Sequence, residues 1–383
     1  MRTIFYNVGH GEAIKIKLEH KIIIRDFGQA LSTKKYIGNP RHNLLDIDCL
    51  VSYLIKEISQ NKSKTYDAIV SHAHEDHYNG FEKMYKMNPK YKFFENSYIP
   101  WLPFGLKTKG LNSYLLSLLI ILSMSKHSKT RDYARRWLFL APKMSALSKH
   151  IIPVKQGYSE PNWRIQNRFL WPSDKVLTTS SSLLEESFLV NHIDSVLTPI
   201  SNQFREILSK YFDDEIQGES FSTEDIEHME ALLKDNEARI NIIRREETVL
   251  FNLLKLELDN HSVVFEIGEE DEKSLFLSDA YNPTVSRIIN LNKLNNYHYK
   301  FIKTGHHGTR GENALFKQNI TAKCLVSCSG PANNRWSGPS LAYNKLLSPS
   351  SSKHYCLDWN YIAKWNKIGI YNFSIPKAMV FKI

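Results

Sequence analysis

The sequence contains no apolar run long enough to cross a membrane as a helix. Its longest run, over 111–124, is shorter than the roughly 20 residues that a spanning helix needs, and a buried or partner-facing helix explains it better. The opening residues MRTIFYNVGHGEAIKIKL hold no apolar signal core and alternate like a β-strand. We therefore expect no membrane span and a cytoplasmic location.

Cysteine is also scarce, with four residues in a chain of 383. Cys49, Cys324, Cys328 and Cys356 do not show the paired spacing of a cysteine-rich metal site, so we expect reduced structural thiols, as is usual in the cytoplasm. With 42% hydrophobic residues, the chain can bury the core of one large or two modest globular domains.

Charge is plentiful but separated along the chain. Residues 81–168 hold 16 Lys or Arg against 4 Asp or Glu, whereas residues 185–237 hold 3 against 14. A solvated face is the ordinary reason for such runs, yet the basic stretch interleaves aromatic residues, as in KYKFF and RDYARRW. We therefore consider a polyanionic substrate. The acidic stretch suggests a docking arm for a basic partner, or a cover over the basic face, and the oligomeric state stays open.

The hydrophobic pattern alternates between strands and helices. Residues 46–60 repeat apolar side chains at helical spacing, at Ile47, Leu50, Leu54 and Ile58. The other predicted helices cover about 111–140, 198–212 and 221–245. The predicted strands are TIFYNV, EAIKIKL, KIIIRDF and YDAIVSH near the start, and LFNLLKLEL, SVVFEIG, SLFLSDA, YKFIKTG and KCLVSCSG near the end. This alternation predicts an α/β fold with functional groups on loops at the strand ends.

One short segment concentrates metal-ligand side chains. HAHEDH follows the predicted strand that ends near Ser71, and its turn lets His72, His74, Asp76 and His77 point into a common volume. Zinc takes about four ligands, one of them water in catalytic sites. His72 and His74 suit one ion, while Asp76 and His77 reach a second ion roughly 3.5–4 Å away. A polar helix cap is the competing interpretation, but four ligand types in six positions favour metal.

Further ligand types follow other predicted strands. Asp279 comes after SLFLS, where its carboxylate could bridge two ions, and His306 and His307 come after YKFIKTG. Asp26 ends KIIIRDF and is predicted to support the ligands from behind. A lone Asp at a strand end is usually a turn former. Four sites that obey one pattern instead predict convergence on a single centre.

These segments resemble a known family. HAHEDH matches the H-x-H-x-D-H signature of the metallo-β-lactamase superfamily. FYNVGHGEAIKI resembles the D-V-G-Q-G-D-A opening of the metallo-β-lactamase-like domain in competence DNA-uptake proteins. FLSDA, IKTGHHGTRGEN and LVSCSGPANNRWSGPS are similar to later segments of that domain, in the same order.

The resemblance implies a fold and a ligand set. The fold is an α/β, four-layer αββα metallo-β-lactamase sandwich, here a single domain over 1–383. Helical insertions are expected at approximately 101–150, which is basic, and 180–247, which is acidic. The implied metal ligands are His72, His74, Asp76, His77, Asp279 and one of His306 or His307.

The sequence departs from the family at several positions. Asn7 and His10 replace the Asp and Gln of the opening motif, and Ser337 and Gly338 stand where the late motif has Gly and His. The superfamily also has a third-motif histidine, which this subgroup often lacks, so we expect the first ion to have fewer ligands. Its candidates here, all in poorly matching contexts, are His127, His150, His192, His228 and His261.

A metal-activated water attacks esters, amides, lactones and phosphodiesters alike. The basic stretch favours nucleic acid, so we predict a metal-dependent nuclease or phosphodiesterase with two divalent ions, zinc or manganese. Asp76 would orient the water and move its proton, and His307 or His10 would serve the leaving group. His307 could equally orient His306.

Two other functions stay open. The first is a hydrolase of a small ester, lactone or amide, with the helical insertion as a lid. The second is a non-enzymatic interaction protein in which the metal stabilises the fold. Four aromatic residues would favour nucleic acid if they stacked on unpaired bases, although each alone is better explained as core. They are Trp101, Phe104, Tyr133 and Trp137.

Overall fold

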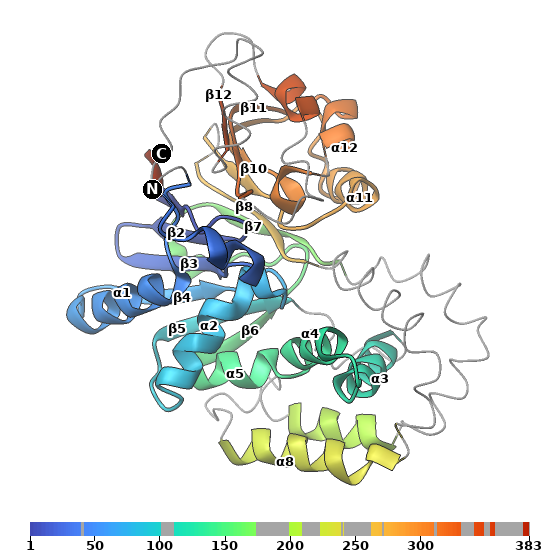
Figure 1. Cartoon of the computed structure of the whole chain (residues 1–383). Helices are drawn as coiled ribbons and strands as arrows, with labels where there is room; N and C mark the ends of the chain where they lie inside the picture. The colour runs from blue at the N-terminus through green and yellow to red at the C-terminus, as the bar shows by residue number, and fades with distance from the viewer. Residues whose placement is uncertain are drawn as a thin grey trace.

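The computed structural model describes most of the chain. The described residues are 1–39, 42–100, 111–173, 199–208, 223–238, 240, 262–269, 272–309, 312–330, 341–347, 353–356 and 378–382. They form two mixed β-sheets with helices around them, so the predicted α/β class is confirmed (Figure 1). The predicted strand at 250–258 lies outside the described residues.

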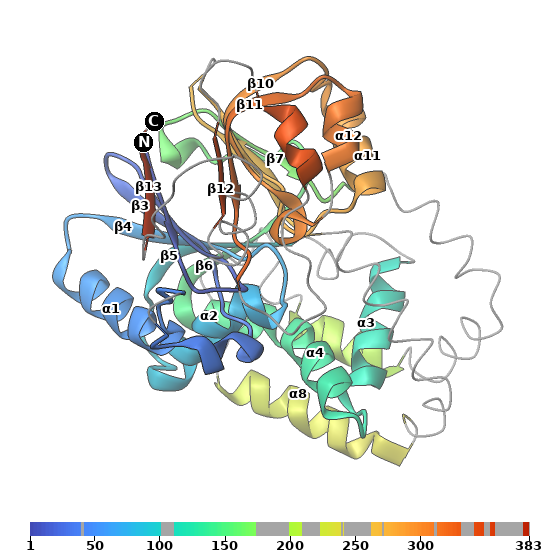
Figure 2. The same ribbon diagram turned by 45° about the horizontal axis from the view of Figure 1, so that its top comes forward.

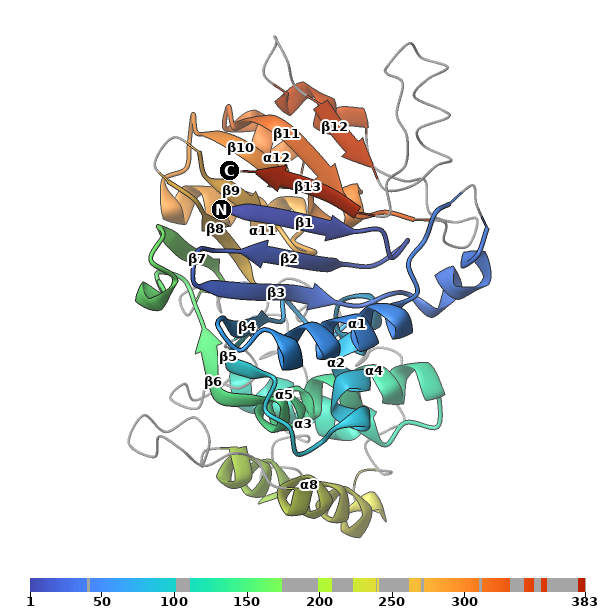
Figure 3. The ribbon, with the colours of Figure 1, turned by 90° about the vertical axis from the view of Figure 1, so that its left-hand side faces the viewer.

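The first sheet has the order β13-β1-β2-β3-β4-β5-β6. Its antiparallel part joins β13, β1, β2 and β3, and its parallel part joins β3, β4, β5 and β6. Figure 3 shows β13, from the far end of the chain, lying beside β1. The strands are β1 (Arg2–Tyr6), β2 (Ala13–Lys17), β3 (Lys21–Phe27), β4 (Thr65–Ile69), β5 (Phe94–Pro100), β6 (Ser148–Val154) and β13 (Ala378–Lys382).

The second sheet has the order β12-β11-β10-β9-β8-β7. Here β9 to β12 run parallel, and β7 and β8 join them antiparallel. The strands are β7 (Asn167–Trp171), β8 (Val264–Ile267), β9 (Ser274–Phe276), β10 (His298–Lys303), β11 (Thr321–Ser327) and β12 (Lys353–Cys356). In both sheets the parallel strands end near the residues that the sequence singled out.

Aromatic and β-branched side chains fill the space between the two sheets. Phe265 and Phe276 stack with ring centroids 4.7 Å apart, and Phe5 of the other sheet meets Phe301 edge-on at 5.6 Å. Each fully buried phenylalanine contributes roughly 1.5–3 kcal/mol. Strand β3 is buried along its whole length because its two faces are both covered, which explains its apolar run Ile22–Ile24.

Helices cover the outer faces of the sheets. Helix α1 (Ile47–Gln60), α2 (Glu75–Met87) and α5 (Leu140–Leu147) pack against the first sheet, and α11 (Asn282–Asn292) and α12 (Glu312–Lys317) against the second (Figure 1). Asp46 caps α1 by accepting a hydrogen bond from the Asp48 amide, 3.1 Å away. The helical period predicted for 46–60 is therefore confirmed, since its apolar stripe faces the core.

The predicted basic and acidic stretches contain a further group of helices. They are α3 (Leu111–Ser123), α4 (Ser128–Leu138), a helix over 199–208 and α8 (Thr223–Asp235). Figure 2 shows α3, α4 and α8 together at one side of the first sheet's helical layer. Among the described residues, no helix is long and apolar enough to span a membrane.

Candidate metal centre

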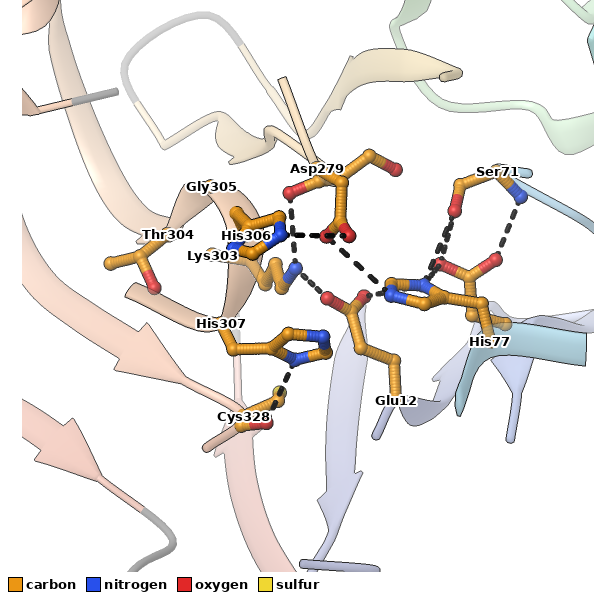
Figure 4. Close-up of polar contacts among 12 residues, drawn as sticks. Glu12, Ser71, His77, Asp279, Lys303, Thr304, Gly305, His306, His307 and Cys328 are labelled. Atoms are coloured by element: carbon orange, nitrogen blue, oxygen red, sulfur yellow. Dashed lines mark hydrogen bonds and ion pairs between the residues drawn. The ribbon is translucent and has the colours of Figure 1, made fainter. Parts of the chain in front are cut away.

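The predicted ligand residues gather where several strands end, and Figure 4 shows four of them, His77, Asp279, His306 and His307. Asp26 lies in the end of β3, and the HAHEDH segment links β4 to the first turn of α2. Asp279 follows β9, and His306 and His307 lie in a short 3-10 turn after β10. Because loops from both sheets meet at this edge, residues more than 200 positions apart become neighbours.

Asp279 lies at the middle of the cluster. Its Oδ2 is 3.4 Å from Nε2 of His72 and 3.9 Å from Nε2 of His306, while its Oδ1 is 3.5 Å from Nε2 of His77. Within the described part of the chain, Nε2 of His72, Nε2 of His77 and Oδ1 of Asp279 are buried without a hydrogen-bond partner. Such orphaned atoms suit coordination to a cation.

The residues behind the ligands set which ring nitrogens carry protons. The Ser71 hydroxyl donates to Asp26 at 2.7 Å, so it accepts from Nδ1 of His72 at 2.9 Å. Nδ1 of His77 donates to the same Asp26 carboxylate at 3.0 Å. Both imidazoles therefore turn Nε2 toward Asp279. Supporting carboxylates of this kind are typical of metal-ligating histidines.

Burial and neighbouring charges move the pKa values of these histidines in opposite directions. Burial, helped by His77 and His74, lowers the pKa of His72 to about 4, so that this ring is neutral at pH 7. Burial also lowers the pKa of His77, but the Asp279 and Asp26 carboxylates outweigh it and raise that pKa well above its ordinary value. The position between these two carboxylates thus favours positive charge.

A second set of ligand atoms surrounds Asp76. Nε2 of His307 lies 3.0 Å from Oδ2 of Asp76, and Nε2 of His10 lies 3.6 Å from the same oxygen. Nδ1 of His307 donates to the Cys328 carbonyl at 3.0 Å, which points Nε2 at Asp76. Burial and then His10 lower the pKa of His307 to about 4. Although burial opposes it, His307 and His77 hold the pKa of Asp76 well below its usual range.

Among the described residues, three groups of ligand atoms are compact enough to hold an ion, with all atoms of a group within 4.8 Å of one another. They are His72 with His74 and Asp279, His10 with Asp76 and His307, and Glu12 with His77 and His307. Zinc–ligand bonds of about 2 Å place ligand atoms within roughly 4 Å of each other. The donor set therefore fits divalent cations that accept nitrogen and oxygen.

Beneath the ligands lies a buried charge network that the sequence reasoning missed. Arg25 donates to Glu12 at 2.7 Å and lies 3.1 Å from Oδ2 of Asp26, and its other terminal nitrogen donates to Ser278. Lys303 pairs with the second oxygen of Glu12 (Figure 4). The first oxygen, which meets Arg25, also lies 3.8 Å from Nδ1 of His77. The sequence did carry a signal, because Arg25 interrupts an apolar strand directly before Asp26 and Lys303 ends another three residues before His306.

The backbone at the centre is held in an unusual conformation. Asp26, Ser278, His306 and His307 all have positive φ, between 43° and 55°. The left-handed region costs a residue with a side chain roughly 1–2 kcal/mol. Gly28 allows a close approach here, since a Cβ on it would lie 2.4 Å from the backbone of Asp76. Strain concentrated in this way is a mark of functional sites.

The remaining candidates lie elsewhere. His127, His150 and His228 are exposed, and none of them belongs to the three ligand groups. Tyr133 and Trp137 are buried in the core on the α2 side of the first sheet, with the Tyr133 ring 5.1 Å from that of His74, so neither presents a face for base stacking. The other candidates lie outside the described residues: His192, His261, Trp101, Phe104, Ser337 and Gly338.

Carboxylates neutralise part of the basic stretch. Arg136 lies 3.7 Å from Glu75 and 3.9 Å from Glu82, and Lys143 lies 2.6 Å from Glu82. Arg135 on α4 pairs with Glu230 on acidic α8. The local excess of positive charge counted along the sequence is therefore smaller on the folded surface.

No family model matches the chain, and no curated protein matches it in sequence.

Proposed function

We propose that this protein is a metal-dependent hydrolase of the metallo-β-lactamase superfamily that acts on phosphodiesters, most simply those of DNA or RNA. The observation that carries the proposal is the convergence of six histidines with Asp76 and Asp279 at the strand ends. Two mixed sheets with helices on their outer faces are compatible with the four-layer αββα sandwich of that superfamily. The basic and acidic helices would then be insertions into it.

The residues of the centre have distinct tasks under this proposal. Bound divalent ions would supply Lewis acidity and a water of lowered pKa. Asp279 would hold His72 and His77 in place through its two oxygens, while Asp26 keeps His77 in the required tautomer. Asp76, with its low pKa, is ionised at neutral pH and could accept a proton from the attacking water.

Charge favours an anionic substrate. Arg25 and Lys303 balance Glu12 and Asp26 within the network, so Asp76 and Asp279 are the carboxylates left facing the histidines. Two divalent cations would exceed those two negative charges and leave the pocket positive. A positive, water-poor pocket stabilises charge that develops on a phosphodiester better than it helps a neutral ester.

One observation favours the alternative, a hydrolase of a small ester, lactone or amide. Helix α4 places the buried ring of Tyr133 beside His74, and Arg136 of the same helix is turned toward Glu75 and Glu82. A helix in this position could serve as a lid over a small substrate. A long nucleic acid would need unpaired basic groups along its path.

The test is an assay of the purified protein with added zinc or manganese. Labelled single- and double-stranded DNA and RNA would be compared with bis(p-nitrophenyl) phosphate and p-nitrophenyl esters. His74→Ala should reduce cleavage by more than ~100-fold, since even a supporting residue of a metal site is worth 10–100-fold. His150→Ala, at an exposed histidine of β6, should keep wild-type activity.

The outcomes separate the candidate functions. Cleavage of nucleic acid that falls steeply with added salt would support the proposal. Hydrolysis of esters without cleavage of any phosphodiester would support the small-substrate alternative. Binding of divalent ions without hydrolysis of any of these substrates would favour the non-enzymatic protein stabilised by metal, and a protein that binds no divalent ion would overturn all three candidate functions.

A further inference from the structure

The turn between β1 and β2 carries His10 into the metal centre. Its Nε2 lies 3.6 Å from Oδ2 of Asp76, and its ring centroid lies 4.2 Å from that of His307. The residue is buried, with 7% of its surface exposed. His10 thus faces the same carboxylate oxygen as His307 does, from the other end of the chain.

Backbone contacts fix this turn in place. The His10 carbonyl accepts from the Ala30 amide at 2.8 Å, and the His10 amide donates to the Thr33 hydroxyl at 3.3 Å. Gly330, after β11, packs so closely that a Cβ on it would lie 2.3 Å from the His10 nitrogen. A side chain carried by a backbone that is held in this way loses less entropy on binding an ion than one on a free loop.

We infer that His10 is a ligand of the second ion and completes a set of two histidines and one aspartate with His307 and Asp76. This inference rests on the proposed metal-dependent function. The first set, His72 with His74 and Asp279, has the same composition. Two histidines and one carboxylate, with a position left for water, are a recurrent ligand set of catalytic zinc.

His77 connects the two sets. Its ring centroid lies 4.1 Å from that of His72 and 5.2 Å from that of His307. The centre therefore consists of two similar triads with His77 between them. Because imidazole suits zinc better than manganese, an additional histidine also shifts the preference of the second position toward zinc.

The inference assigns His10 a role different from that of a proton donor to the leaving group. It also gives meaning to a departure from the competence-protein motif, which has Gln at this place. An amide oxygen is a weaker zinc ligand than imidazole, so His10→Gln should weaken the second ion without removing every ligand atom. The loss of His10 should leave the first triad intact.

The experiment is a titration of the metal-free full chain with Co²⁺, followed by visible absorption, and direct analysis of bound zinc after desalting. Wild type is expected to bind two ions. His10→Ala should bind the first ion normally and the second ~100-fold or more weakly, with His10→Gln in between. The matched control is His42→Ala, because His42 is equally buried but packs on Tyr36 away from the ligands.

Each alternative result has a clear meaning. Two ions bound by His10→Ala with wild-type affinity would overturn the inference and leave the proposed function standing. The inference would also be overturned, and the proposed function would still stand, if the wild type bound only one ion or if a folded His10→Ala variant lost both ions. Binding of no ion by wild type would overturn the inference and the proposed function together. Circular dichroism of each variant shows whether a loss reflects unfolding, and His10→Gln preserves the test if His10→Ala is unfolded.

Discussion

The protein contains two kinds of ion pair, and they differ in burial more than in geometry. Under the metal centre, Arg25 and Glu12 meet at 2.7 Å with side chains that are 0% exposed. On the helical side, Arg135 and Glu230 also pair, but their side chains are 30% and 43% exposed. Exposed pairs contribute about 0–1 kcal/mol, whereas each buried ion has first lost its hydration at a cost of several kcal/mol.

This difference in burial indicates that the buried and the exposed ion pairs have different roles in the fold. Apolar residues of similar volume would often stabilise a fold as well as a buried ion pair does. The network of Glu12, Arg25 and Lys303 is therefore better explained by geometry, since it holds Glu12 against His77 and links β3 to Ser278 beside Asp279. The pairs on α4 instead help to join helices at the surface.

The largest effect on stability should come from breaking the buried network. Glu12→Ala leaves Arg25 without its closest carboxylate and Lys303 without its partner in the interior. We expect a loss of roughly 3–5 kcal/mol in the free energy of unfolding, measured by urea denaturation. Glu230→Ala is the surface control and should cost about 1 kcal/mol or less. Equal losses in the free energy of unfolding for the two variants would remove the distinction between the buried and the exposed ion pairs.

A paired replacement tests whether the network serves geometry or stability. Glu12→Met combined with Lys303→Met removes both members of one buried pair, and Arg25 keeps the Asp26 carboxylate 3.1 Å away. We expect the double variant to recover much of the stability that Glu12→Met alone loses, because no lysine is left unpaired. The affinity for metal should stay low in the single and in the double variant, because both lack Glu12. Recovery of metal binding together with stability would show that the network does not position the ligands.

A buried neutral histidine provides a smaller effect that depends on pH. His354 on β12 is buried beside Ser327, and burial lowers its pKa to about 3. The unfolded chain binds this proton near pH 6.5 and the folded chain does not, so stability falls as pH decreases from about 6.5 toward 3. The slope is roughly 1.4 kcal/mol per pH unit.

His354→Gln can keep the hydrogen bond to Ser327 but has no proton to gain. Urea denaturation of both proteins at pH 7 and pH 5 should therefore show a smaller loss for the variant. Parallel curves would mean that His354 does not titrate on unfolding.

Much of the fold, and most of the residues that gather in the candidate metal centre, could be predicted from local patterns. The run KIIIRDF occupies β3 over its whole length, and the period of 46–60 matches α1. The segment HAHEDH predicted candidate metal ligands, because four of its six residues are of ligand type and have few other reasons to occur together. These signals are local, so one sequence is enough to detect them.

The pairing of distant residues could not be predicted in the same way. Nothing near Glu12 in the sequence indicates that Lys303 will neutralise it, or that His10 will share Asp76 with His307. A charge count along the basic stretch misses one of its ion pairs for the same reason, because Glu230, which pairs with Arg135, lies 95 positions away. Contacts across the fold decide which charges are free to act, and a charge count along the chain does not contain them.

The smallest expected effect concerns the surface pair of α4 and α8. In a double-mutant cycle of Arg135→Ala and Glu230→Ala, we expect a coupling free energy of about 1 kcal/mol or less.

The affinity for single-stranded DNA should change more clearly than stability. If acidic α8 covers the basic helix, Glu230→Ala frees Arg135, raises the affinity for single-stranded DNA a few-fold and steepens its salt dependence by about one phosphate contact. Glu95→Ala, which removes the carboxylate 2.8 Å from Lys149, is a control at another surface pair. Unchanged affinity for Glu230→Ala would mean that α8 does not compete with a polyanion, and the acidic helix would then be explained by packing on α4 alone.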